Sequence, residues 1–243
     1  MIDFSVFLTA DGWISLLTLS VLEIVLGIDN IIFISLIAGK LELTSQRKKA
    51  RSIGLLLALI IRISLLFGIT WIIGLKDPLF HIGSFGCTGR DLILFVGGLF
   101  LIVKTTIEIV EKINHVEASG PTIQSLTVKS AIIQIVFIDI IFSFDSILTA
   151  VGLVSNVILM VLAVIIAMIV MLVFSEKVSD FIFKHQTVKM LALSFLVVIG
   201  LALVLESFHI HVEKAYIYSA LVFSMGVELL NMKMRSNAHK ANQ

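Results

Sequence analysis

Charged residues are scarce in this chain, and that scarcity decides the class of protein. Of its 243 residues only 14% are charged, whereas 58% are hydrophobic. A soluble domain of this length has no core large enough to bury so much apolar surface, so lipid has to cover it. The composition therefore excludes an ordinary soluble domain and predicts that a lipid bilayer surrounds the chain.

Cysteine is nearly absent, and so are basic residues at the N-terminus. The single cysteine, Cys87, excludes a disulfide framework and a thiolate metal cluster, and neither redox chemistry nor a bound cofactor is indicated. Most basic residues lie in short loops and the net charge is only +1, so no nucleic-acid partner is predicted. Asp3 and Asp11 stand where a secretory signal would be basic, so we expect the first span to remain in the mature protein.

What the chain has in abundance is long apolar runs. A helix needs about 20 such residues to cross the hydrocarbon layer. Runs close to that length occupy residues 12–38, 51–75, 91–113, 128–154, 156–175, 188–206 and 215–232. Because the runs are uninterrupted, they predict helices and not the alternating strands of a barrel. The predicted fold is an all-α polytopic bundle of about seven transmembrane helices.

The basic residues of the loops predict the orientation of the bundle. With the N-terminus outside, the inner segments hold thirteen Lys and Arg residues and the outer segments hold three. Basic residues accumulate on the cytoplasmic side of membrane proteins, so we expect the N-terminus outside and the C-terminus in the cytoplasm. Arg62 and Lys104 remain within predicted spans.

The chain also divides into two similar halves. A turn-forming stretch at 117–121 separates the third span from the fourth, and it predicts repeats over 1–116 and 122–210, followed by a seventh helix at 211–232 and a cytoplasmic tail at 233–243. Span one carries Glu23 to Asn30 and span four carries Asp139 to Ser146, each a carboxylate, five residues, an aspartate and a small polar residue. Because each half has an odd number of helices, an inverted 3+3 repeat is predicted.

An inverted repeat would bring the two motifs together near the membrane midplane. An aspartate at that depth costs about 2.5–3.5 kcal/mol on insertion scales, so a compensating partner is expected. Carboxylate, amide and hydroxyl oxygens suit Mn²⁺, Mg²⁺ or Ca²⁺ better than copper or zinc. The predicted metal ligands are Glu23, Asp29, Asn30, Asp139, Asp145 and Ser146, with Gly27, Arg62 and Ser143 in support.

Alternative roles, including purely structural ones, stay open for these and other polar residues. Arg62 can neutralise one carboxylate while Asn30 and the two serines cross-link helices, which would make the cluster a purely structural network. His209 and His211 in the last outer loop could capture a metal ion, although such histidines are commonly solvated. Glu228 and Asn231 share one face of span seven, where they could line an inner vestibule or serve as a cap or headgroup contact.

The two motifs resemble those of the TerC/Alx family of integral membrane proteins, whose members carry Glu-(x)5-Asp-Asn in one span and Asp-x-x-Phe-Ser-x-Asp-Ser in another. The similarity covers residues 10–235 and is greatest to the short bacterial inner-membrane branch that lacks appended regulatory domains. The resemblance implies metal-ion efflux across the inner membrane, with manganese as the favoured cargo.

Three functional hypotheses follow from these patterns. The first is a secondary transporter that exports a divalent cation by alternating access, with protons as a candidate counter-ion. The second is a non-transporting assembly factor or ion-responsive scaffold, which nothing in the sequence excludes. The third is an intramembrane aspartyl hydrolase built on Asp29 and Asp145, but a proton-sharing pair has no need for the other motif residues, so we do not expect an enzyme. The oligomeric state is not predicted.

Overall fold

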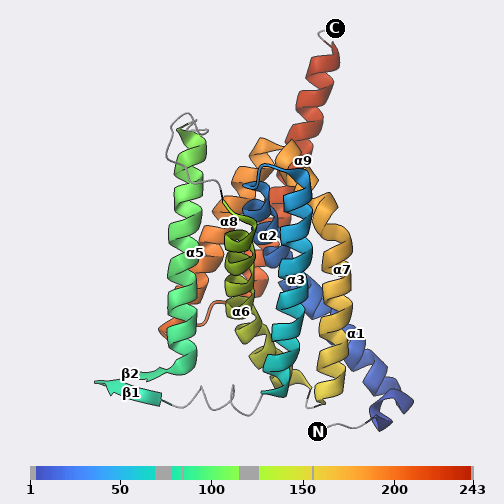
Figure 1. Ribbon diagram of the computed structural model, residues 1–243, viewed down its shortest axis with the longest axis vertical. Coiled ribbons are helices and arrows are strands. Elements are labelled where there is room, and N and C mark those ends of the chain that lie inside the picture. Colours follow the sequence, from blue (N-terminus) through green and yellow to red (C-terminus); the bar gives the residue numbers. More distant parts are fainter. Residues whose placement is uncertain (1–3, 69–77, 84, 115–125, 155, 242–243) are drawn as a thin grey trace. The chain divides into compact units, whose positions relative to one another are not determined.

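Long helices account for nearly all of the described chain in the computed structural model (Figure 1). The structure describes residues 4–68, 78–83, 85–114, 126–154 and 156–241. Its elements are η1 (Ser5–Leu8), α1 (Ala10–Leu26), α2 (Ile28–Gly39), α3 (Thr44–Phe67), β1 (Pro78–Ile82), β2 (Phe85–Thr88), α5 (Gly89–Ile113), α6 (Val128–Leu153), α7 (Val157–Lys184), α8 (Gln186–Ser207) and α9 (Lys214–Ala241). With α1 and α2 taken as one span, 7 helices in this part of the chain are long and apolar enough to cross a membrane, which confirms the predicted all-α bundle.

Two helices have bounds that differ from those expected from hydropathy. The second span was expected at 51–75, but α3 runs from Thr44 to Phe67, and residues 69–75 lie outside the described part of the chain. Its first turns are polar, and Arg47 anchors them by donating a hydrogen bond of 2.6 Å to the carbonyl of Leu41. Helix α9 likewise continues to Ala241, through residues expected to form a tail. Polar helix formers extend both helices beyond the apolar stretch that hydropathy detects.

A short antiparallel hairpin, β1 and β2, follows α3 and was not expected. Phe80 pairs with Cys87 and His81 pairs with Gly86. Gly83 lies in the turn with a φ of 63°, a conformation that glycine adopts without the strain of a side chain. The strands are too short for their alternation to stand out from the apolar runs on either side.

The chain forms two compact units, and each combines segments from both sequence halves. The first unit holds residues 1–90 and 122–181, and the second holds residues 91–121 and 182–243. Each predicted repeat thus contributes its first two spans to one unit and its third span to the other. A two-fold relation between the repeats would produce such a division, although the repeat itself stays a prediction.

Helices α2, α3 and α6 form the centre of the first unit (Figure 1). Helix α3 packs along α6, and Gly54 permits their close contact, because a Cβ added there would lie 2.8 Å from Cγ2 of Ile135. Helix α2 packs against both of these helices and is buried along most of its length. Polar side chains on α2, α3 and α6 are therefore held inside the unit.

In the second unit, helices α5 and α8 approach each other through paired glycines. A Cβ at Gly98 would lie 2.7 Å from the carbonyl oxygen of Gly200, and a Cβ at Gly200 would lie 3.0 Å from the carbonyl oxygen of Gly98. Helix α9 packs on α8, where the Tyr218 and Phe195 rings lie 6.4 Å apart between centroids. Only 6% of its apolar window is buried, so most of α9 is left for lipid to cover.

Candidate metal-ion site

The first motif lies where helix α1 passes into helix α2 at Gly27. The backbone of Gly27 stays helical, with φ −81° and ψ −9°, and its N–H donates to the Glu23 carbonyl over 2.9 Å. The span therefore consists of two helices that meet at Gly27, where α1 ends and α2 begins. Gly27 lets α7 approach, since a Cβ at this position would lie 2.5 Å from Sδ of Met171.

Arg62 on α3 connects the two motifs. Its Nη2 lies 2.7 Å from Oδ1 of Asp139, and its Nε donates to both oxygens of the same carboxylate over 3.2 and 3.1 Å. Its Nη1 lies 3.1 Å from Oε2 of Glu23. The side chain of each of these three residues is only 3% exposed. Counted over the whole residue, Glu23 and Asp139 are 2% exposed. Arg62 therefore lies where the sequence led us to expect a buried counter-ion.

The small polar residues of the motifs complete this cluster. Nδ2 of Asn30 donates to Oδ1 of Asp139 over 3.1 Å, which joins the first motif directly to the second. The Ser143 hydroxyl lies 3.0 Å from Oδ2 of Asp139 and also donates to that residue's carbonyl. The Ser146 hydroxyl donates to the Ser143 carbonyl over 3.3 Å and lies beside the Glu23 carboxylate. Asp139 is thus contacted from α2, from α3 and from its own helix.

One oxygen of this cluster has no hydrogen-bond partner among the described residues. It is Oδ1 of Asn30, which is fully buried. A buried amide oxygen without a donor is unfavourable by about 1–3 kcal/mol, and a cation or a water molecule would satisfy it. The oxygen therefore fits the donor chemistry expected for a hard cation.

The structure describes the two remaining aspartates of the motifs to different extents. Asp29 is buried in the first turn of α2, beside Asn30 in the sequence. The backbone of Asp145 continues helix α6, but its side chain lies outside the described part of the structure. Among the described side chains, no three acidic, histidine or cysteine residues converge so that they could hold a metal ion. The guanidinium of Arg62 instead occupies the position between Glu23 and Asp139.

Charge in the cluster is only partly balanced. The motifs supply four carboxylates, Glu23, Asp29, Asp139 and Asp145, and Arg62 on α3 supplies the guanidinium that contacts two of them. Burying an ion costs several kcal/mol unless a partner compensates it. Arg62 contacts two of these carboxylates, and the formal charge of the four carboxylates and this guanidinium together is negative.

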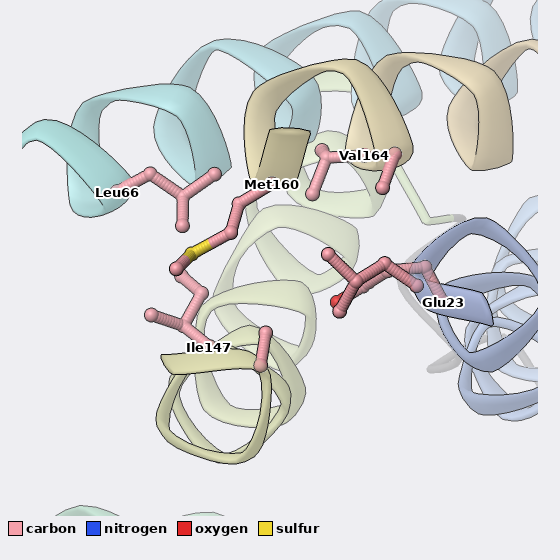
Figure 2. Close-up of a pocket in the computed structure, with 8 residues that line it drawn as sticks. Glu23, Leu66, Ile147, Met160 and Val164 are labelled. Atoms are coloured by element: carbon pink, nitrogen blue, oxygen red, sulfur yellow. The ribbon is translucent and has the colours of Figure 1, made fainter. Parts of the chain in front are cut away.

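A small cavity adjoins the Glu23 carboxylate (Figure 2). Its volume is about 10 Å³, close to the space that one water molecule needs. Figure 2 shows the Glu23 side chain pointing from α1 toward Leu66 of α3, Ile147 of α6, and Met160 and Val164 of α7. The remaining described lining residues are Leu19, Ala150 and Ala163. Glu23 is thus the one charged residue in the described lining of an otherwise apolar cavity.

The weaker sequence candidates lie in the second unit. Nε2 of His209 is 3.0 Å from Oδ2 of the buried Asp91, and Nε2 of His211 is 3.5 Å from Oε1 of Glu213. Glu108 pairs with Lys189 over 3.5 Å. Glu228 accepts a hydrogen bond from Thr187. Each of these residues therefore contacts a neighbour within its own unit.

Sequence reasoning missed Met171, which packs against Gly27, and the apolar residues around Glu23. No local signal distinguishes Met171 from the other apolar residues of α7, because the span is hydrophobic all round. Only the glycine marked the position where a close neighbour would fit.

Known proteins resemble this chain over nearly its full length. The model of the integral membrane protein TerC family matches residues 8–243. A UPF0053 protein of Haemophilus influenzae is 48% identical over 93% of this chain and 95% of its own length. The UPF0053 inner membrane protein YgdQ of Escherichia coli is 50% identical over 91% and 93%, respectively. The longer inner membrane protein YoaE of Escherichia coli is 47% identical over 93% of this chain but only 43% of its own length. No solved structure matches. The chain is therefore a member of the integral membrane protein TerC family.

Proposed function

We propose that this TerC family protein exports a divalent metal cation, with Mn²⁺ favoured, by alternating access at the buried motif cluster. The observation that carries the proposal is the hydrogen bond of 3.1 Å from Asn30 to Asp139, because it joins the last residue of the first motif to the first residue of the second, 109 residues further along the chain. Oxygen donors from both motifs thus gather inside one unit. Mn²⁺, Mg²⁺ and Ca²⁺ prefer such oxygen ligands.

Arg62 has a defined part in this proposal. Its guanidinium neutralises Glu23 and Asp139 while no metal is bound, and an incoming cation competes with it for these oxygens. Oδ1 of Asn30, which has no partner among the described residues, would supply one further oxygen ligand, and the motif carboxylates Asp29 and Asp145 would supply others. A conformational change that moves the guanidinium away from the carboxylates would then expose the complete ligand set.

Transport also requires a driving force. We place the chain in the inner membrane with its N-terminus outside, in keeping with its basic loops and with the names of its relatives YgdQ and YoaE. Export of two positive charges against an inside-negative potential costs about 4.6 kcal/mol per 100 mV. Carboxylates release a metal ion when they bind protons, so inward proton movement is the proposed coupling.

The deciding experiment measures Mn²⁺ flux in proteoliposomes containing the purified protein. Asp29→Asn and Asp145→Asn are the informative variants, because Glu23 and Asp139 hold Arg62 and their loss would disturb folding. Asp180→Asn on α7 is the matched control, since Asp180 is exposed and lies outside the motifs. We expect wild type and the control to transport Mn²⁺, and each motif variant to lose most of the flux at a normal yield of folded protein. Full flux in both motif variants would exclude the proposed site.

A second candidate function is a non-transporting scaffold with a structural ion network. It is favoured by the close pairing of Arg62 with Glu23 and Asp139. It is also favoured because, among the described side chains, no three acidic, histidine or cysteine residues converge so that they could hold a metal ion. A scaffold predicts no flux from wild-type protein, and it predicts that the motif variants change thermal stability alone. A panel of divalent cations in the same liposomes separates the two candidates.

A further inference from the structure

A second polar concavity lies far along the chain from the motif cluster, within the second unit. Its volume is about 560 Å³, and it lies where the end of α7 meets the start of α8 and the second half of α9. The described lining residues are Lys184, His185, Gln186, Thr187, Leu229, Met232, Lys233 and Arg235. The concavity, called here the basic pocket, shares no residue with either motif.

The position of the basic pocket relative to the bilayer follows from the ends of three spans. The candidate membrane spans are Val157–Lys184, Gln186–Ser207 and Lys214–Arg235, so the first ends, the second begins and the third ends at this pocket. The ends of apolar spans lie at the boundary between hydrocarbon and headgroups. A molecule in the basic pocket is therefore at the level of the phospholipid headgroups.

The lining of the basic pocket suits an anion with an apolar tail. Lys184, Lys233 and Arg235 supply three fixed positive charges, and no carboxylate belongs to its described lining. Helix α8 begins at the pocket, and the side chain of its N-cap residue His185 makes no capping hydrogen bond. N–H groups of a first helical turn attract phosphate groups. Leu229 and Met232 add an apolar surface beside these charges.

Glu228 lies next to the basic pocket but does not cancel its charge. Its Oε1 accepts a hydrogen bond from the Thr187 hydroxyl, which fixes α9 to the start of α8. A single carboxylate engaged in this way leaves an excess of positive charge on the lining. Basic pockets between transmembrane helices bind anionic lipid headgroups through such an excess.

We propose that the basic pocket binds the phosphate headgroup of an anionic phospholipid and that the lipid joins α9 to the end of α7, beside the start of α8. Helix α9 has little protein around it, with 6% of its apolar window buried, so it depends on few contacts for its position. A phosphate held by Lys184 at the end of α7 and by Lys233 and Arg235 on α9 would connect these helices from the headgroup side. The proposal does not rest on metal transport.

The test uses the full-length protein in nanodiscs and in detergent. The probe is phosphatidylglycerol, with phosphatidylcholine of the same acyl chains as the neutral lipid. The pocket variant carries Lys184→Gln, Lys233→Gln and Arg235→Gln. The control carries Lys49→Gln, Lys129→Gln and Lys177→Gln, which removes the same charge from positions outside the basic pocket. Native mass spectrometry measures retained lipid, and thermal unfolding measures the stabilisation that each lipid gives.

We expect wild type and control to retain phosphatidylglycerol over phosphatidylcholine, and the pocket variant to bind it at least about tenfold more weakly. Equal loss in the control, or no preference for the anionic lipid, would overturn the proposal. Inorganic phosphate and glycerol 1-phosphate are added in separate arms. Displacement of the lipid by either at millimolar concentration would assign the pocket to a soluble anion instead and would also overturn it. If the triple variant misfolds, Arg235→Gln alone must still weaken lipid retention, because Arg235 is exposed on the last turns of α9.

Discussion

Nη2 of Arg62 on α3 lies 2.7 Å from Oδ1 of Asp139 on α6, and neither side chain is more than 3% exposed. This ion pair joins the second span to the fourth in the interior of the first unit. The same guanidinium reaches Glu23 on α1 over 3.1 Å, so three spans depend on one cation. Several consequences of that dependence can be measured.

Arg62→Gln should destabilise the protein strongly. The substitution leaves the buried Glu23 and Asp139 without their cation, and breaking a buried ion pair in this way costs about 3–5 kcal/mol. Arg62→Lys should lose less, because it keeps the charge but cannot donate to both carboxylates in the same forked geometry. Thermal unfolding in detergent gives the order wild type, Lys variant, Gln variant. A Gln variant as stable as wild type would show that the carboxylates are protonated or solvated.

Gly98→Ala should separate helices α5 and α8. The new Cβ would lie 2.7 Å from the Gly200 carbonyl oxygen, a backbone atom that can move only with its helix. Overpacking of this kind costs about 1–3 kcal/mol. Gly226→Ala on α9 is the control, because a Cβ there meets no heavy atom within 4 Å, and it should be neutral or slightly stabilising. Comparable unfolding temperatures for the two variants would contradict the close helix contact.

Leu66→Ala should enlarge the small cavity beside Glu23. Leu66 is 1% exposed and lines that cavity, so its truncation should cost about 2–5 kcal/mol. Leu56→Ala on the same helix removes the same atoms from a residue that is 58% exposed, and it should cost much less. Chemical denaturation of both variants tests the difference. Equal losses would mean that Leu66 is not packed in the interior.

A reporter fused after Gln243 should be active only in the cytoplasm. The expectation rests on the thirteen basic residues that this orientation places inside, against three outside. Paired fusions of a cytoplasm-active and a periplasm-active reporter at the same site give opposite signals. Periplasmic activity of the fusion would overturn the predicted orientation.

Local patterns in the sequence were enough to predict the spans and to single out the residues of the cluster. Apolar length identifies a span because lipid imposes it, and the matched register of Glu23 to Asn30 with Asp139 to Ser146 pointed to a shared location. Arg62 stood out because an arginine is costly within a span unless a carboxylate accompanies it. These inferences use one strong physical constraint each.

Contacts between spans could not be derived in the same way. That Arg62 serves Glu23 and Asp139, and that Met171 fills the space beside Gly27, depends on how helices are rotated about their axes. Spans that are hydrophobic all round, such as α7, carry no periodic signal for that rotation. The division of the chain into two units also depends on long-range packing, which apolar length does not encode.

Because the chain is synthesised from its N-terminus, the two acidic partners of Arg62 become available at different times. Glu23 precedes Arg62 by 39 residues, whereas Asp139 follows it by 77. When α3 enters the bilayer, Glu23 is therefore the only one of the two acidic partners already made, and the arginine has to rely on it. The first two spans should then leave the insertion machinery as a pair, and α6 should dock onto a guanidinium that is already buried. Early loss of Glu23 would accordingly show as degradation of the nascent chain, before any mature bundle exists to be destabilised.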